Sequence, residues 1–277
     1  MEPHLIKISN LTCKYKSGRD VLHVANFHLD RGELVFLLGP SGIGKSTLVE
    51  AIGLINNTAK MSDNSVLDYY DEQKVTHSLI DIWKRKYSEL ENFRKEHFSF
   101  IFQNNYLMPN LTAGENMMLT LLMKGDTEAV AMEKIRFYMN VVSLTDEVIN
   151  KQIYFLSGGQ KQRLAFVRAI ASPFNVLIAD EPTGNLDSIT ASRLMEFTRK
   201  SIVKHKKSGL FVSHDINLAL YYADRIYIFK PEKKGNEIMG YIDEHLSIYR
   251  SENNWYNNNG LMKDPYQTIL STYQELR

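Results

Sequence analysis

A glycine-rich stretch early in the chain carries the residue types that bind phosphate. It reads Gly-Pro-Ser-Gly-Ile-Gly-Lys-Ser-Thr and fits the pattern G-x-x-x-x-G-K-[ST]. Glycines let the backbone curl so that successive N–H groups point at one phosphate, and the helix that follows adds its positive end. We expect Lys45 to reach the β- and γ-phosphates and the Ser46 hydroxyl to ligate Mg²⁺. The predicted nucleotide-phosphate loop consists of Gly39, Pro40, Ser41, Gly42, Ile43, Gly44, Lys45, Ser46 and Thr47.

A second glycine motif, Leu-Ser-Gly-Gly-Gln, stands ahead of a predicted helix over Gln160–Ala171. Its two glycines expose backbone N–H groups at the start of that helix, which makes a second anion-binding terminus in one chain. One nucleotide does not need two such sites in a small domain. We therefore infer that each motif supplies half of a composite pocket and that two subunits face each other. The residues assigned to this second half are Ser157, Gly158, Gly159 and Gln160.

Two carboxylates follow a short apolar run. Val176–Ala179 is wholly apolar, and Asp180 and Glu181 come directly after it. This pattern predicts a buried strand that delivers acids at its carboxyl end, which is the edge where ligands bind in open α/β sheets. Asp180 suits the coordination shell of Mg²⁺, and Glu181 suits the base that orients a water molecule attacking a phosphate.

The elements that must position these groups alternate along the chain. The apolar run Leu34–Leu38 precedes the phosphate loop, and Lys45–Ile55 has helical character. Leu210–Val212 and Arg225–Phe229 are further candidate strands. This alternation of strands and helices predicts an α/β fold with a mainly parallel sheet.

Composition excludes several classes of protein. The chain has 277 residues, of which 44% are hydrophobic and 23% charged, as in ordinary globular proteins. The 33 basic and 32 acidic residues leave a net charge of +1, so we expect no nucleic-acid partner. The single cysteine, Cys13, cannot form an internal disulfide, and the Met-Glu-Pro-His start lacks the features of a signal peptide. The longest apolar runs, such as Leu34–Leu38, are too short to span a bilayer, so we expect a cytosolic chain.

Over residues 4–242 the chain resembles the nucleotide-binding subunit of ABC transporters, on the motifs given above. The resemblance implies an ATPase domain over residues 1–242, with a P-loop core of mainly parallel strands, an antiparallel β subdomain and a helical subdomain at about 104–172. Residues 243–277 have no recognised counterpart and are interpreted as a C-terminal extension. The implied ligands are ATP and Mg²⁺, and the implied reaction is hydrolysis of ATP to ADP and phosphate.

Four further residues acquire roles only through this resemblance. Tyr15 corresponds to the aromatic residue that stacks on adenine, and Gln103 to the glutamine that senses the γ-phosphate and Mg²⁺. Asp187, in the Gly-Asn-Leu-Asp stretch, belongs to the loop that crosses the dimer interface, and His214 matches the switch histidine that contacts the γ-phosphate. The implied catalytic residues are Glu181, His214, Gln103 and Lys45, and the implied metal ligands are Ser46, Gln103 and Asp180.

Two stretches, Leu107–Asn116 and Glu181–Asp187, point to a subgroup. They look like the lipoprotein-release, macrolide-efflux and cell-division ATPases, although some amino-acid importer ATPases are close in sequence. This resemblance implies a second ATPase subunit in a homodimer and an integral-membrane permease as partners, and it places the chain in the cytoplasm, peripheral on the inner face of the cell membrane. Gln103 and Asn104–Leu111 are expected to form the docking groove for a cytoplasmic helix of that permease.

Other segments depart from the family pattern or match none of its motifs. Residues 56–70 lack Gly and Pro and make the β subdomain atypical, and Leu79–Lys95 is a candidate amphipathic helix. Residues 110–150 look largely helical, with Asn110 or Thr112 as the N-cap. The end of the chain, with Tyr266, Ile269, Leu270 and Tyr273, is interpreted as a packing helix. Histidines interpreted as surface or packing residues are His4, His23, His28, His77, His97, His205 and His245.

Two other functions are compatible with parts of this pattern. A soluble ABC ATPase acting on ribosomes or DNA usually carries two cassettes or a long coiled coil, and this chain has one set of motifs and no long heptad array. An inactive nucleotide switch is disfavoured because Glu181 and His214 are both present.

Overall fold

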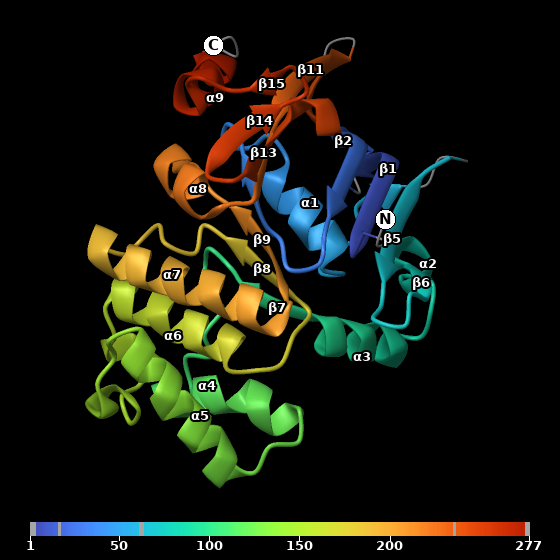
Figure 1. Ribbon diagram of the computed structural model, residues 1–277. Helices are drawn as coiled ribbons and strands as arrows, with labels where there is room; N and C mark the ends of the chain where they lie inside the picture. The colour runs from blue at the N-terminus through green and yellow to red at the C-terminus, as the bar shows by residue number, and fades with distance from the viewer. Residues whose placement is uncertain (1–3, 16–17, 61–63, 235–236, 275–277) are drawn as a thin grey trace.

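Two β-sheets and a group of helices make up the fold. The computed structural model describes residues 4–15, 18–60, 64–234 and 237–274. Figure 1 shows helix α1 (Lys45–Ile52) beside both sheets, and a group of helices at the other end of the molecule. Helix α1 contacts β2 (Asp20–Leu29) of one sheet and β8 (Val176–Asp180) of the other. This arrangement confirms the predicted α/β class.

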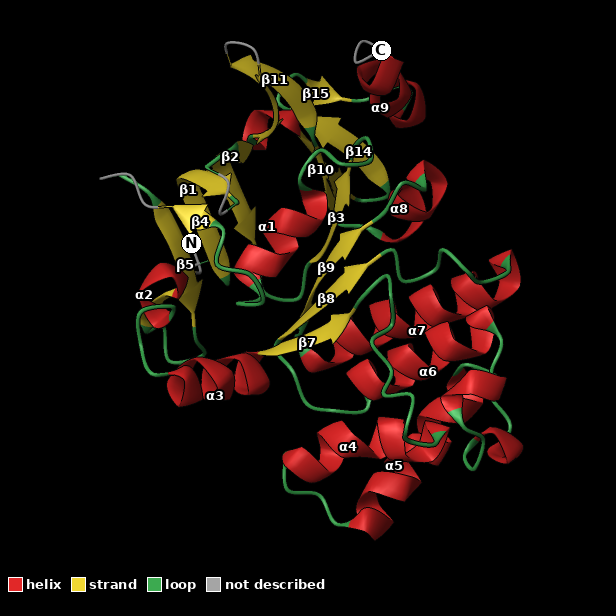
Figure 2. Ribbon diagram, turned by 180° about the vertical axis from the view of Figure 1, so that it is seen from behind, coloured by secondary structure: helices red, strands yellow, loops and turns green. Residues whose placement is uncertain are grey.

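The larger sheet has a parallel centre, visible in Figure 2. Its parallel strands, in spatial order, are β10 (Arg225–Ile228), β3 (Leu34–Leu38), β9 (Ser208–Val212), β8 and β7 (Phe98–Ile101). All five residues of β3 are buried, which explains its continuous apolar sequence. Alternate β3 side chains join two different cores, because Leu34 and Phe36 pack on one face and Val35 and Leu37 on the other. Since these strands are parallel, their carboxyl ends meet along one edge of the sheet.

The second sheet is mostly antiparallel. Its strands are β11 (Lys230–Lys234), β12 (Glu237–Ile242), β2, β1 (Ile6–Lys14), β5 (Val66–Tyr70) and β6 (Thr76–Ser78), with β4 (Ala59–Lys60) paired to β1. Strand β1 alternates buried and exposed side chains over much of its length, as expected for a strand with one covered face. β12 pairs with β2 in parallel and lies close to the phosphate loop, because a Cβ atom on Gly240 would lie 1.9 Å from the Ile43 carbonyl oxygen.

The helical part lies beside the β7 end of the parallel sheet, as Figures 1 and 2 show. Its elements are α4 (Ala113–Met123), α5 (Glu128–Val141), α6 (Gly158–Ile170) and the 3-10 turns at Asp146–Val148 and Ile153–Phe155. The prediction of a largely helical 110–150 segment is confirmed. Of the two candidate caps, Thr112 begins α4, because its hydroxyl accepts from the Glu115 N–H while the Glu115 carboxylate accepts from the Thr112 N–H.

The expected single helix over Leu79–Lys95 is wrong. The chain forms two helices, α2 (Leu79–Ile82) and α3 (Tyr87–His97), separated at Trp83–Lys86. α2 packs on β5 and β6, whereas α3 bridges the two sheets, because it contacts β7 and its Phe93 ring packs on Tyr69 of β5. The two helices meet these strands in different ways, and the chain turns between them.

The polar segment after residue 242 contains more structure than its composition suggested. After a 3-10 turn at Glu244–Leu246, β13 (Ser247–Ser251) pairs with β10, and β14 (Asn254–Asn257) and β15 (Gly260–Leu261) continue the larger sheet. Helix α9 (Pro265–Gln274) packs on α8 (Ile216–Tyr222) and buries Ile269 completely. The expected packing helix is therefore present, although the Tyr273 side chain lies outside what the structure describes. The division into a domain and an extension stays a prediction.

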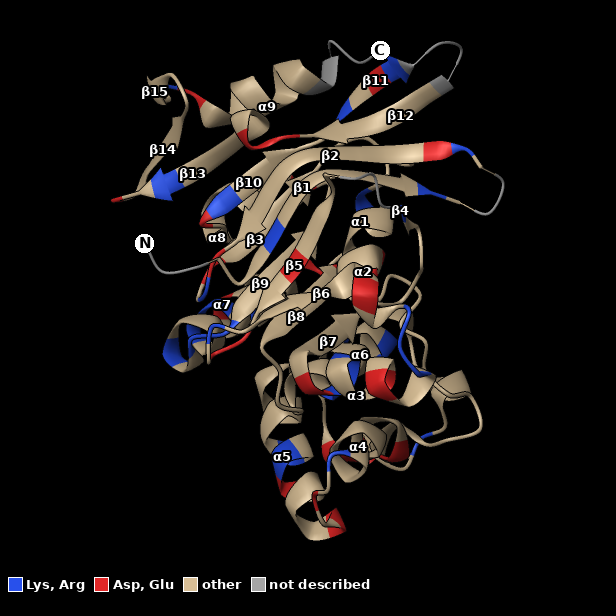
Figure 3. Ribbon diagram, turned by 90° about the vertical axis from the view of Figure 1, so that its right-hand side faces the viewer, with Lys and Arg blue, Asp and Glu red and all other residues tan. Residues whose placement is uncertain are grey.

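Charges of both signs are mixed over the surface. Figure 3 shows Lys and Arg beside Asp and Glu along the same elements, α3 and α5 among them. No helix within the described residues is long and apolar enough to cross a bilayer.

Candidate nucleotide-binding site

The predicted phosphate loop connects β3 to α1. Gly42 and Gly44 have φ angles of 76° and 101°, a region that other residues adopt at a cost. At Gly39 a Cβ atom would lie 2.8 Å from the Cβ of Phe229, so only glycine fits there. No side chain caps the start of α1, which leaves its first N–H groups available to a phosphate. The backbone therefore has the form expected of an anion-binding loop.

Lys45 is held inside the loop that it follows. Its Nζ donates to the carbonyl oxygens of Gly39 at 2.7 Å and Pro40 at 2.8 Å, and the residue is buried. Burial lowers the pKa of Lys45, whereas the nearby carboxylates of Glu181 and Asp180 raise it. The fold thus brings the loop lysine and both predicted acids to one place.

Tyr15 adjoins the phosphate loop from the end of β1. Its hydroxyl lies 3.0 Å from the Thr47 hydroxyl, and 45% of the residue is exposed. A cavity of about 370 Å³ opens beside it, lined among others by Ser41 and Gly42 of the loop and by Ile238 and Met239 of β12. An aromatic ring beside a cavity next to the phosphate loop fits the predicted adenine-stacking role. Lys16 and Ser17 of this segment lie outside the described residues.

The acidic pair and the histidine meet at the carboxyl edge of the parallel sheet. Asp180 ends β8, and Glu181 follows with a φ angle of 49°, in the left-handed region. The Glu181 N–H donates to the Val212 carbonyl at 3.0 Å, and one carboxylate oxygen lies 2.9 Å from His214 Nδ1. An outlying backbone angle at a residue held by neighbours on both sides is characteristic of functional sites.

Gln103 lies close to this edge by strand register. In the β7–β8 pair Ile101 is opposite Ala179. Gln103 and Glu181 each follow this pair by two residues, just past the carboxyl ends of the two strands. Gln103 is exposed at the start of the loop that follows β7. Arg168 of α6 holds this loop, because its guanidinium donates to the carbonyls of Asn105 at 2.6 Å and Tyr106 at 2.8 Å.

The second glycine motif begins α6. The Ser157 hydroxyl accepts from the Gln160 N–H at 3.2 Å, and the Gln160 side chain accepts from the Ser157 N–H at 3.0 Å. This capping box leaves Ser157 and Gly158 exposed at the helix start. A Cβ atom on Gly159 would lie 3.3 Å from the Asn185 carbonyl oxygen, so the motif lies against the loop after Glu181. The motif is accessible to a partner molecule.

Asp187 has a structural role within its own chain. Its carboxylate accepts from the Thr190 N–H at 2.9 Å and caps α7 (Ser188–His205). That hydrogen bond lowers the pKa of Asp187. Its predicted part in a nucleotide site across a dimer interface stays a proposal.

Gln162 is a positioning residue that the sequence analysis missed. It is 2% exposed, its amide nitrogen donates to the Glu181 carbonyl at 3.0 Å, and its amide oxygen accepts from the Asn185 N–H at 2.9 Å. Gln162 thus links the helix of the second glycine motif to Glu181. A sequence signal existed, because Gln162 lies three and four residues before the buried Ala165 and Phe166, on the apolar face of α6.

Removing this link should slow hydrolysis without weakening ATP binding. We expect Gln162→Ala to lower kcat by about tenfold or more, because small displacements of a catalytic group are costly. The ATP dissociation constant should change by less than about twofold, because the side chain of Gln162 bonds to the backbone of Glu181 and Asn185 and not to the phosphate loop. Gln162→Glu keeps an oxygen that accepts from the Asn185 N–H but loses the donor to the Glu181 carbonyl. Its kcat should therefore lie between those of wild type and Gln162→Ala. A steady-state assay with a separate ATP-binding titration checks this, and equal losses in Kd and kcat would contradict it.

The donors that could hold Mg²⁺ are the hydroxyl of Ser46, the carboxylate of Asp180 and the amide oxygen of Gln103. All three are hard oxygen donors, which is the ligand type that Mg²⁺ takes alongside phosphate oxygens. Ser46 is exposed on the loop helix, and Asp180 is half-buried at the strand end. The donor atoms of these three residues are therefore of the type that Mg²⁺ binds.

The fold and site together define an ATPase cassette with a phosphate loop on a parallel sheet. The family model described as "ABC transporter" matches residues 22–184. The uncharacterized ABC transporter ATP-binding protein MJ0796 of Methanocaldococcus jannaschii is 34% identical over 246 residues, covering 87% of this chain and 100% of the relative. The lipoprotein-releasing system ATP-binding protein LolD of Novosphingobium aromaticivorans is 32% identical over 228 residues, covering 79% of this chain and 94% of the relative.

A solved structure agrees with these relatives. The dimeric structure of a post-hydrolysis state of MJ0796, bound to ADP and Pi, has a TM-score of 0.67 and 32% identity. It covers 80% of this chain and 93% of the solved chain. The chain belongs to the ABC transporter family. It is an ATP-binding cassette, and its homologues are ATPases. The resemblance to the group that contains the lipoprotein-release ATPases is confirmed.

Proposed function

We propose that the chain is an ATP-hydrolysing subunit that dimerises head-to-tail on ATP and powers a membrane transporter or mechanotransmission complex. We favour the lipoprotein-release or macrolide-efflux type and a location at the inner face of the cell membrane, beside an integral-membrane permease. One observation carries the ATPase proposal: Lys45, Asp180, Glu181 and His214 converge at one sheet edge. The accessible Ser157-Gly158-Gly159 motif supports the dimer, because it fits the missing half of a composite pocket.

Each group in the site has a task that its contacts suit. Lys45 exchanges its loop carbonyl partners for β- and γ-phosphate oxygens when ATP binds. The Glu181 carboxylate accepts a hydrogen bond from the attacking water and aligns it with the γ-phosphate. His214 exchanges its contact with Glu181 for the γ-phosphate. Tyr15 stacks on the adenine, and Ser157, Gly158 and Gly159 of a second chain close on the γ-phosphate.

Mg²⁺ would be held by Ser46, Asp180 and Gln103. When bound, it neutralises charge on the β- and γ-phosphate oxygens.

The permease contact is proposed at the loop after Gln103 and the groove beside it. Tyr106 is 64% exposed and packs edge-on against Phe102 at 5.0 Å between ring centroids. Phe102 and Arg168 also line a cavity of about 290 Å³ between α3, β7, α4 and α6. The charged residues of its lining are mostly basic, and aromatic rings line it as well: Arg94, Lys95, Lys124, Arg168 and one acid, Glu91, with Phe98, Phe100 and Phe102. An acidic, partly apolar helix of a permease suits this lining.

A charged residue at Tyr106 should uncouple the ATPase from its permease. We expect Tyr106→Glu to keep basal ATP hydrolysis within about twofold, because Tyr106 contacts no residue of the proposed catalytic set in the part of the chain that is described. Stimulation by the reconstituted permease should fall about tenfold or more. Tyr106→Phe should behave as wild type, and Tyr221→Glu, at a tyrosine that is 71% exposed on α8, is the matched control. Loss of basal activity in Tyr106→Glu would show that the residue is structural.

Purification of the native protein in mild detergent tests the wider proposal. Recovery of a membrane subunit that stimulates ATP hydrolysis supports a transporter function. Recovery of ribosomes or DNA in its place would favour a soluble ABC ATPase, and a solute-specific importer permease would favour the amino-acid importer alternative.

A further inference from the structure

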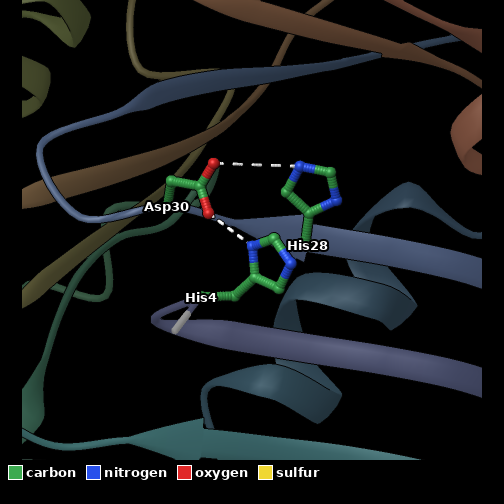
Figure 4. A group of neighbouring side chains, drawn as sticks. All are labelled: His4, His28 and Asp30. Atoms are coloured by element: carbon green, nitrogen blue, oxygen red, sulfur yellow. Dashed lines mark hydrogen bonds and ion pairs between the residues drawn. The ribbon is translucent and has the colours of Figure 1, made fainter. Parts of the chain in front are cut away.

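Three side chains with metal-binding groups converge at the end of β2, away from the nucleotide site. His4 precedes β1, His28 lies near the end of β2, and Asp30 begins the turn that leads to β3. Each offers one ligand atom, and these atoms all lie within 4.8 Å of one another. His4 Nδ1 is 2.5 Å from one Asp30 oxygen, and His28 Nε2 is 3.9 Å from the other. Figure 4 shows both imidazole rings facing the two oxygens of one carboxylate.

His28 is fixed in a way that leaves one ring nitrogen for a ligand. The residue is 8% exposed, and its backbone N–H donates to the Tyr227 hydroxyl at 3.1 Å. Its Nδ1 lies 3.4 Å from the Tyr227 hydroxyl and 3.8 Å from the Glu244 carboxylate, while Nε2 faces Asp30. A polar partner behind the second ring nitrogen is the usual way in which a metal-bound histidine is oriented.

The backbone of Asp30 is also fixed. Its N–H donates to the Glu33 carboxylate at 2.9 Å, and its carbonyl accepts from the Ser208 hydroxyl at 2.9 Å. The side chains of His4 and Asp30 are 40% and 44% exposed, so both can adjust. The cluster therefore combines a rigid histidine with two adjustable ligands.

We propose that His4, His28 and Asp30 form a binding site for a divalent transition metal of the zinc class. Two imidazoles and one carboxylate suit Zn²⁺, with water at the remaining position. Tetrahedral ligands at about 2.1 Å from Zn²⁺ lie about 3.4 Å from one another. The observed separations, 2.5 Å for His4–Asp30, 3.9 Å for His28–Asp30 and at most 4.8 Å between any two ligand atoms, bracket that spacing.

The site joins two separate stretches of chain, residue 4 ahead of β1 and residues 28–30 at the end of β2. It ties the start of β1 to the end of β2 and to the turn before β3, at the opposite end of β3 from the phosphate loop. The metal therefore stabilises the junction between the two sheets and takes no part in ATP chemistry. This inference does not rest on the proposed transport function.

Metal titration of the untagged full chain tests the proposal. After removal of metals and chelator, we expect wild type to bind one Zn²⁺ per chain in calorimetry without nucleotide, and Zn²⁺ to raise the melting temperature. Co²⁺ should give the visible absorption of a four-coordinate site. His4→Gln and Asp30→Asn should each weaken Zn²⁺ binding by at least about tenfold and abolish the thermal shift. Both substitutions are at exposed side chains, so the fold should be preserved, and unchanged basal ATP hydrolysis verifies this.

The matched control is His77→Gln, which removes a histidine paired with a single carboxylate, Asp71, at 2.9 Å. This variant should bind Zn²⁺ as wild type does. Failure of wild type to bind Zn²⁺ at 100-fold molar excess would overturn the proposal. Equal Zn²⁺ affinity in wild type and His4→Gln would overturn it as well.

Discussion

Glu181→Gln should bind ATP at least as tightly as wild type and hydrolyse it about 100-fold or more slowly. The substitution keeps the shape of the side chain and the left-handed backbone that Val212 and Gln162 hold. It removes the carboxylate that we propose as the acceptor of a hydrogen bond from the attacking water. It also removes a negative charge beside Lys45, and with it a source of repulsion toward the γ-phosphate. The expected state is a closed dimer that holds ATP.

Size-exclusion chromatography with ATP and Mg²⁺, combined with a phosphate-release assay, measures both effects. Glu181→Gln should elute as a dimer with ATP and as wild type without it. His214→Ala is the informative companion, because His214 Nδ1 lies 2.9 Å from the Glu181 carboxylate. A Glu181→Gln variant that hydrolyses ATP at nearly the wild-type rate would remove Glu181 from the mechanism and move the main role to His214.

Mixed dimers should reveal whether the pocket is shared between two chains. Lys45→Ala alone should lose most ATP affinity and remain monomeric, because Lys45 supplies the buried cation of the phosphate loop. Ser157→Asp keeps the helix cap of α6, since Asp caps as well as Ser, but places a negative charge against the γ-phosphate of the facing chain. Neither homodimer should form an intact site.

A mixed dimer of Lys45→Ala and Ser157→Asp chains should contain one intact site if the pocket is composite. Both substitutions then fall in the same pocket, and the other pocket is wild type. A mixed dimer of wild type with the doubly substituted chain should contain none, because each pocket then carries one substitution. Nucleotide occlusion per dimer, measured on differently tagged chains, distinguishes these cases. The reverse pattern would show that Ser157 and Lys45 act on the same chain's nucleotide.

The sequence by itself determined the family and the parallel α/β core, and it contained the residues of the candidate site. Each of these depends on short stretches whose residue order dictates local form, such as the glycines before Lys45 and the apolar run before Asp180. A wholly apolar run of five residues predicts a strand buried on both faces, and β3 has that burial.

The tertiary structure decided everything that depends on contacts between distant residues. The break between α2 and α3 depends on packing against distant strands, β5 for α2 and both β5 and β7 for α3, and local helical periodicity does not encode those contacts. The polar tail pairs with β10 because a neighbouring strand satisfies its backbone, whatever its composition. Gln162 reaches Glu181 across 19 positions, and His4 reaches Asp30 across 26. Such pairings arise from the folding of the chain in space, so a single sequence contains the residues but not their proximity.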